Sequence, residues 1–176
     1  FIAIAGLEEN VRTPEWSMWD PGFFSLPGSQ YKFRDWKKGG HGEVNLHKAI
    51  VESVDTYFYK LAHELEIEKI HKYLDQFGFG SKTGIDLPRE ATGVAPSKEW
   101  KRRRFGMPWY RGDTISVGIG QGYNLVTPLQ LAVATAALAN GHTLVQPVLS
   151  RSGMHPPSMS ILDGPPLTPS QPLMLS

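Results

Sequence analysis

Three short sequences in this chain carry the residue types that acyl transfer through a serine nucleophile requires. They are Ser29-x-x-Lys32, Ser53-Val54-Asp55 and Lys82-Thr83-Gly84. In that chemistry one Ser attacks an amide carbonyl, and a Lys one helical turn further on accepts its proton. A second Ser passes the proton to the leaving amine, an Asn-type side chain holds the substrate amide, and a Lys-Thr pair holds a substrate carboxylate.

Two of the three matches lie in surroundings that do not suit these roles. A nucleophile at the start of a helix would have its Lys on the same side, but Ser29 is followed by aromatic residues and soon by Gly39-Gly40, which disfavours a helix. Lys82-Thr83-Gly84 should lie on a strand, yet it follows a glycine-rich helix exit. The Ser53-Val54-Asp55 match is different, because it lies inside a strong helical pattern.

Ser53 and Asp55 lie inside a helical pattern, which raises a geometric problem. Apolar residues recur at helical spacing from Leu46 to Leu65. In one unbroken helix, two residues turn by about 200°, so Ser53 and Asp55 would point in opposite directions. Either these residues are ordinary polar positions of one helix, or the helix breaks here and Asp55 caps a new one from Thr56. We favour the break, because Asp suits a cap better than a helix interior.

Other polar groups suggest weaker hypotheses. Asp20, Asp35 and His41 are close enough in sequence to converge on a metal ion, or they can simply cap turns in a glycine-rich segment. The segment 118–122 contains three glycines but lacks the following helix and acidic residue of a dinucleotide site. The basic stretch 98–104 is expected to be a solvated surface loop. We expect no cofactor and no nucleic-acid partner.

The composition is that of an ordinary globular domain. The 176 residues include 18 Lys and Arg against 17 Asp and Glu, 32 Gly and Pro, and no Cys. This balance gives no global attraction to nucleic acid or anionic membrane and excludes a disulfide framework or a plain helical bundle. The apolar run 1–7 has no basic residue before it, so we interpret it as the end of an element in a longer protein rather than as a signal peptide.

The pattern also predicts where the elements lie. Loops and short extended pieces are expected over 8–45, and a second helix over 66–77 that ends at Gly78. Loop is expected over 79–113, a short strand over 114–119 and another over 143–148. Thr127-Pro128 and Asn140-Gly141 predict the start and end of a buried helix. The Pro-rich tail, residues 151–176, is expected to be irregular.

Longer motifs surround these residues, and together they are specific. They are His41–Leu46 (HGEVNL), Glu52–Tyr59 (ESVDTYFY), Thr83–Leu87 (TGIDL), Trp109–Thr114 (WYRGDT), Val117–Tyr123 (VGIGQGY) and Thr127–Leu131 (TPLQL), with Asp20–Gly22 and Arg34–Lys38 fitting as well. This set resembles the central part of the transpeptidase domain of the penicillin-binding protein 2 family, the elongation-specific class B enzymes of Gram-negative bacteria. The resemblance covers residues 1 to about 150.

The resemblance implies an α+β fold, of which residues 1–150 form the helical portion with long loops and short strands. In that family the Ser-x-x-Lys nucleophile would lie just upstream of Phe1, and the carboxylate-binding strand well downstream of Gly122. Only Ser53 and Asp55 carry over as catalytic residues, so the chain alone is expected to be inactive. Some members bind zinc through two Asp, a His and a Cys. Asp20, Asp35 and His41 would match three ligands, but the fourth place falls at Val54, and we assign no metal.

The resemblance also implies a function for the parent protein. It would be a peptidoglycan D,D-transpeptidase that cross-links cell-wall stem peptides through a serine acyl-enzyme and binds β-lactams. Its location would be the periplasmic face of the inner membrane, reached through an N-terminal anchor absent from this chain, with elongation-machinery proteins as possible partners. The alternatives are a serine β-lactamase or D,D-carboxypeptidase of the same fold, and a non-catalytic helical interaction domain.

Overall fold

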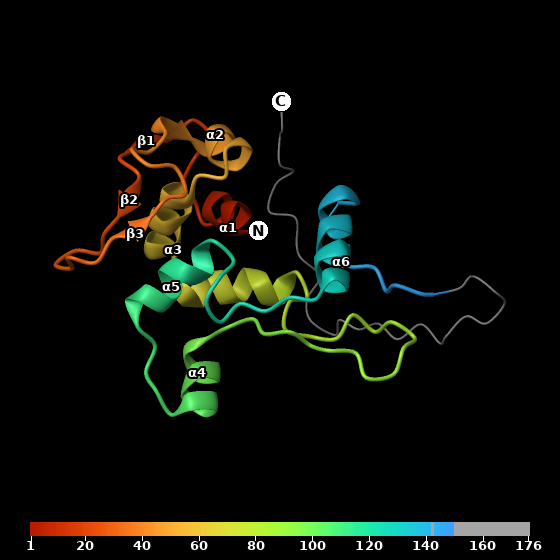
Figure 1. Cartoon of the computed structure of the whole chain (residues 1–176). Helices are drawn as coiled ribbons and strands as arrows, with labels where there is room; N and C mark the ends of the chain where they lie inside the picture. The colour runs from red at the N-terminus through yellow and green to blue at the C-terminus, as the bar shows by residue number, and fades with distance from the viewer. Residues whose placement is uncertain (142, 150–176) are drawn as a thin grey trace.

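The computed structural model describes residues 1–141 and 143–149, in which short helices and two small sheets surround one long, bent helix (Figure 1). The helices are α1 (Ile2–Glu8), α2 (Leu46–Val51), α3 (Asp55–Gln76), α4 (Lys98–Phe105), α5 (Arg111–Gly118) and α6 (Pro128–Ala139). The strands are β1 (Ser17–Asp20), β2 (Phe23–Phe24), β3 (Phe33–Arg34) and β4 (Gly42–Asn45). The expected α+β class with long loops and short strands is confirmed.

The central helical segment is interrupted twice, at both places that the sequence pattern indicated. α2 begins after Asn45, whose side chain accepts a hydrogen bond from the Lys48 N–H at 2.9 Å, and ends before Ser53. Within α3, Glu66 has φ 63° and ψ 163°, so the helix bends there into two arms (Figure 1). Gly78 follows the second arm with φ 79°, as a left-handed C-terminal cap requires.

Residues 8–45 form the expected loops with short extended pieces. β1 pairs antiparallel with β4, with Asp20 opposite Gly42, and β2 pairs antiparallel with β3. The β1–β4 pair leads directly into α2. The pairing therefore brings Asp20, at the end of β1, close to the segment that precedes α2.

The core forms where α1 and α5 pack against α3. Ala5, Leu61, Leu65 and Val117 are almost completely buried there. The contact between α5 and α3 is especially close at Gly118, where an added Cβ would lie 2.4 Å from the Ala62 Cβ. Only glycine permits this approach of the two helices.

Two expectations for residues 98–119 are wrong. The basic stretch is helix α4, whose N-terminus is capped by the Ser97 hydroxyl and whose end is left-handed Gly106. Its five Lys and Arg residues left no apolar stripe to reveal it. The expected strand is helix α5, because packing on α3 and the bond from the Tyr110 N–H to the Asp113 carboxylate (2.8 Å) override the strand preference of its β-branched residues.

A buried lysine joins these two helices. Lys101 of α4 is 1% exposed, and its Nζ lies 2.5 Å from Oδ2 of Asp113 in α5. The ammonium group also lies 4.3 Å from the centre of the Tyr110 ring. The expectation of a solvated loop is therefore wrong for this residue, since pairing allows its charge to be buried.

Helix α6 begins and ends where expected, but only one of its faces is covered by the described residues. Thr127 and Gln130 cap its start reciprocally, and Pro128 is its first residue. Ala134 and Ala137 are buried, whereas Leu131 is 45% exposed, so the prediction of a buried helix is wrong for the described part of the chain. Figure 1 shows α6 standing beside the rest of the helices rather than among them.

The last predictions concern the C-terminal part. Residues 143–148 form no strand, which contradicts the expectation, and the tail 151–176 lies outside the described residues. Among the helices that the structure describes, none combines the length and apolar character needed to cross a bilayer.

The Lys82-Thr83-Gly84 sequence lies in a loop, as its surroundings predicted. The Glu90 carboxylate accepts hydrogen bonds from the Thr83 N–H at 2.7 Å, the Thr83 hydroxyl at 2.5 Å and the Gly84 N–H at 3.1 Å. Although partial burial alone would raise the pKa of Glu90, these hydrogen bonds hold it below its usual value. Gln130 fixes the same loop to α6, since its amide donates to the Ser81 and Thr92 carbonyls.

Replacing Gly118 by Ala tests the close contact of α5 with α3. We expect Gly118→Ala to lower the free energy of unfolding by about 1–3 kcal/mol, because the new methyl group overlaps Ala62. Urea unfolding measures this. Gly112→Ala in the same helix is the control, since its Cβ would meet Phe33 at an ordinary 3.6 Å. Equal stability of the two variants would contradict the packing argument.

Replacing Glu90 by Gln tests the loop anchor. Because the folded-state pKa of Glu90 is lowered, its stabilising effect is present above the unfolded value of 4.5 and is lost as pH falls through the lower folded value. We expect Glu90→Gln to reduce the hydrogen-exchange protection of the Thr83 and Gly84 amides near neutral pH. The difference in protection between this variant and the unchanged protein should disappear at acid pH.

Glu99→Gln is the matched control, because it removes the same charge from an exposed position of α4. Those two amides should keep their protection in this variant. A pH-independent gap for Glu90→Gln would show that the carboxylate charge does not hold the loop.

Candidate functional site

The turn between α2 and α3 carries the predicted site residues. Ser53 has φ 53°, in the left-handed region, and Val54 is extended with ψ 101° before α3 begins at Asp55. The predicted helix break is therefore confirmed. A left-handed Ser costs on the order of 1–2 kcal/mol, so surrounding contacts must hold it.

The contacts that hold this turn come from both sides. The Val54 N–H donates to the Ala49 carbonyl at 2.9 Å, and the Val54 side chain is fully buried. The indole N–H of Trp36 donates to the carbonyl oxygens of Glu52 at 3.1 Å and Ser53 at 3.0 Å. Ser53 itself is exposed and Asp55 half-buried. The chain thus presents its Ser at the surface while Val54 anchors it in the core.

The start of α3 is capped from another segment, which corrects one expectation. Val54, not Asp55, occupies the cap position, and Asp55 is the first residue of the helix. The Thr56 N–H, which needs a partner at this end of the helix, donates to Oδ2 of Asp35 at 3.1 Å. The Asp55 carboxylate instead accepts from the backbone N–H of Trp36. Asp35 therefore performs the capping that the sequence argument had assigned to Asp55.

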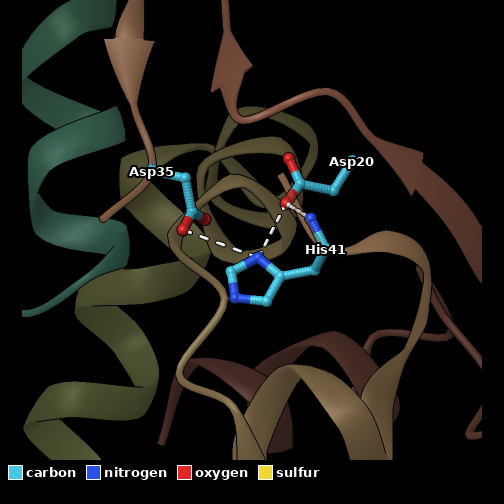
Figure 2. Close-up of side chains that lie close together, drawn as sticks. All are labelled: Asp20, Asp35 and His41. Carbon is cyan, nitrogen blue, oxygen red and sulfur yellow. Dashed lines mark hydrogen bonds and ion pairs between the residues drawn. The ribbon is translucent and has the colours of Figure 1, made fainter. Parts of the chain in front are cut away.

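Asp35 belongs to a buried cluster with Asp20 and His41 (Figure 2). The Nδ1 atom of His41 lies 2.8 Å from Oδ2 of Asp20 and 3.6 Å from Oδ1 of Asp35, and all three side chains are inaccessible to solvent. Figure 2 shows the imidazole turned with Nδ1 toward both carboxylates. The convergence that the sequence suggested as one of two possibilities is therefore real.

Backbone N–H groups surround the carboxylates of this cluster. Asp20 accepts from Gly22 at 2.7 Å and from the His41 N–H at 2.8 Å, and Asp35 accepts from Lys37 at 3.1 Å. Burial alone would raise the pKa of Asp20, but the bonds from Gly22 and His41 hold it below its usual value. The second possibility that the sequence suggested, that Asp20 and Asp35 cap turns, is thus also correct.

A glycine allows the cluster to close. Gly40 has φ 79°, and a Cβ there would lie 2.1 Å from the Asp20 carbonyl oxygen and 2.4 Å from the Gly22 nitrogen. No other residue type can bring the segment before His41 so close to the end of β1.

The electrostatics of Asp55 are coupled to this cluster. Burial raises the pKa of Asp55, the negative charge of Asp35 raises it further, and the Trp36 N–H and His41 oppose the shift. A carboxyl group at this position can accept a hydrogen bond from a substrate amide when ionised and donate one when protonated. Ser53, two residues earlier in the chain, is exposed to solvent.

The other sequence matches are placed elsewhere and used differently. Ser29 lies in the loop between β2 and β3, where its hydroxyl accepts from the Tyr31 N–H at 3.1 Å. Lys32 lies over the Phe23 ring at 4.1 Å, and no helix joins it to Ser29. The Ser29–Lys32 pair therefore lacks the geometry of a nucleophile and its base.

Sequence reasoning named the two residues that position the turn but missed these roles. Trp36 precedes Ser53 by 17 positions, and Asp35 precedes the Thr56 N–H that it caps by 21. Asp35 was considered only as a metal ligand or turn cap, and Trp36 only as part of the matched segment Arg34–Lys38. No local spacing indicates a side chain that bonds to the backbone of a distant turn.

Comparisons with known proteins agree with this architecture. Residues 1–161 match the family described as penicillin binding protein transpeptidase domain. The chain is 49% identical to peptidoglycan D,D-transpeptidase MrdA of Haemophilus influenzae over 152 residues, or 86% of this chain and 23% of the relative. Identity to MrdA of Acinetobacter baumannii is 51% over 150 residues, which is 85% of this chain and 22% of that relative. The chain thus spans less than a quarter of these relatives.

Solved structures give the same result. A crystal structure of Pseudomonas aeruginosa PBP2 in complex with WCK 5153 superposes with a TM-score of 0.83 at 46% identity, covering 86% of this chain and 34% of that one. The Helicobacter pylori complex of PBP2 with MreC gives a TM-score of 0.81 at 44% identity. The match covers 88% of this chain and 28% of that one. Together with the confirmed turn at Ser53, these matches show that the chain belongs to the penicillin-binding protein transpeptidase domain family.

Proposed function

We propose that this chain is the helical portion of a peptidoglycan D,D-transpeptidase domain and that it supplies the Ser53–Val54–Asp55 motif to the active site. The observation that carries the proposal is the left-handed turn at Ser53, which Trp36 and Asp35 hold in place. The family and the names of the relatives support the reaction class.

The roles of the two residues follow from their placement. The nucleophile and its Lys would come from a part of the parent protein upstream of Phe1, and the carboxylate-binding strand from a part downstream of Gly122. Ser53, exposed at the turn, would relay the proton from the base to the leaving amine of the donor stem peptide. Asp55 would hold the amide of the same substrate. A β-lactam, whose amide bond imitates the scissile one, would be bound by the same groups.

The location and partners of the parent follow from that reaction. Peptidoglycan lies outside the cytoplasmic membrane, so we propose the periplasmic face of the inner membrane, with the parent anchored by an N-terminal segment. The solved complex of Helicobacter pylori PBP2 with MreC supports an elongation-machinery partner for the parent of this chain. No cofactor enters the proposed reaction.

The isolated 176-residue chain is expected to form no stable adduct with a fluorescent penicillin. Ser29 has no helix that would bring Lys32 beside it, and Ser53 has no Lys three residues further on. Denaturing gel electrophoresis with fluorescence detection measures the labelled fraction. Stoichiometric labelling would show that one of these serines is a nucleophile and would overturn the assigned roles.

A chimera tests Ser53 and Asp55 in a complete active site. The chain replaces the corresponding 152 residues of the Haemophilus influenzae relative, and the rate of penicillin acylation is followed. We expect Ser53→Ala to slow acylation by about 10²–10⁴-fold, because a proton relay is lost. Asp55→Asn should have a smaller effect, since an amide keeps a hydrogen-bonding oxygen.

Ser29→Ala is the matched control and should label like the unsubstituted chimera, with circular dichroism verifying that each variant folds. Equal rates for Ser53→Ala and Ser29→Ala would contradict the proposed function. Rapid turnover of the penicillin, instead of a lasting adduct, would indicate a serine β-lactamase.

A further inference from the structure

We propose that in this chain the Nδ1–H of His41, which is bonded to Asp20 and faces Asp35, takes the place of a metal ion, and that the apolar Val54 stands where the family resemblance puts a fourth ligand. The cluster would then be a metal-free support for the Ser53 turn. This inference concerns only the residues of this chain and does not depend on the proposed reaction.

The set of donor atoms does not fit a structural zinc site. Such sites have four protein ligands, drawn mostly from Cys and His. This chain contains no Cys, and Val54 is an apolar side chain that is fully buried. The side chains of Asp20, Asp35 and His41 are also closed to solvent.

The shortest distance within the cluster is that of a hydrogen bond. Two ligands of a tetrahedral zinc ion, each about 2.0–2.1 Å from the metal, lie roughly 3.3 Å apart. His41 Nδ1 and Asp20 Oδ2 are separated by only 2.8 Å, a typical N–H···O distance. Because an ionised carboxylate only accepts hydrogen bonds, the proton of this bond lies on Nδ1. A metal ion at this cluster would have to displace that proton before Nδ1 could bind it.

The carboxylate of Glu52, which also lies near His41, does not complete a metal site either. Glu52 approaches the opposite ring nitrogen, with 3.9 Å between its Oε2 and Nε2 of His41. Nε2 is buried and has no hydrogen-bond partner among the described residues, but it points away from Asp20 and Asp35 (Figure 2). Four oxygen and nitrogen donors are thus present, but they do not face a common point.

The two buried carboxylates are satisfied without a cation. Backbone N–H groups of Gly22 and His41 bond to Asp20, and those of Lys37 and Thr56 bond to Asp35. The Nδ1–H of His41 adds a fifth donor between the two. A buried charge that is fully hydrogen-bonded needs no further compensation, so the fold can hold the cluster closed by itself.

The metal content of the full chain tests the proposal directly. The protein is incubated with excess zinc chloride, desalted and analysed by inductively coupled plasma mass spectrometry, alongside Asp20→Asn. We expect far less than one zinc per chain and an identical melting temperature with and without EDTA. One tightly held zinc that Asp20→Asn loses would overturn the proposal. Zinc retained equally by both proteins would lie on surface histidines and support it.

A gain-of-function variant tests the place of Val54. Val54→Cys restores a thiolate to the set, and we expect it to bind one equivalent of Co²⁺ with a thiolate-to-cobalt charge-transfer band. Val54→Ala, which opens similar space without a ligand, should show no such band. Absence of the band in folded Val54→Cys would overturn the assignment of Val54 to the fourth position.

A pair of His41 variants tests the hydrogen-bonding role. His41→Gln keeps an N–H donor, whereas His41→Ala leaves Asp20 and Asp35 without a shared one. We expect His41→Ala to melt lower than His41→Gln and to accelerate exchange of the Trp36 indole N–H in NMR spectra. Zinc should restore neither property. Recovery of His41→Ala upon zinc addition, or equal melting of the two variants, would contradict the proposal.

Discussion

The hydrogen bond between His41 and Asp20 is the contact on which the geometry of the candidate site depends. It fixes the end of β1 against the segment before β4, and Asp35 lies against the same ring nitrogen. From there two connections reach the site: the Asp35 carboxylate caps α3, and the adjoining Trp36 holds the carbonyl of Ser53. His41 is also in direct side-chain contact with this second connection, because the centre of its ring lies 5.3 Å from that of the Trp36 ring in an edge-to-face arrangement.

This arrangement explains how an exposed Ser keeps a strained conformation. The left-handed turn at Ser53 is unfavourable by itself, and α2 is too short to impose it. The buried Val54 and the two acceptor carbonyls bound by Trp36 fix the residues on both sides. The exposed Ser53 therefore lies on a backbone that is constrained from both sides, which is the condition for a preorganised site.

The remainder of the described fold serves the same turn from a greater distance. α5 packs on the first arm of α3 through Gly118, and α4 is joined to α5 by the buried pair of Lys101 and Asp113. α6 and the 81–93 loop are joined by the Gln130 amide, and Leu131 of α6 remains exposed. Among the described helices, α3 holds most of the buried residues, whereas α4 and α6 each leave much of their surface exposed.

The sequence by itself determined those features that depend on neighbouring residues. Asn45, Thr127-Pro128 and Gly78 marked helix ends correctly, because capping acts within one turn of helix. The break at Ser53 was also predicted, but from the preference of Asp for a cap position, and the structure places Val54 at that position and Asp55 in the first turn of α3. The tertiary structure decided what depends on distant contacts. It made α5 a helix through packing on α3, buried Lys101 beside Asp113, and gave the capping of Thr56 to Asp35. The pair of Lys101 and Asp113 is 12 positions apart, and the pair of Asp35 and Thr56 is 21 positions apart. At such separations no local sequence pattern indicates which partner the folded chain brings near.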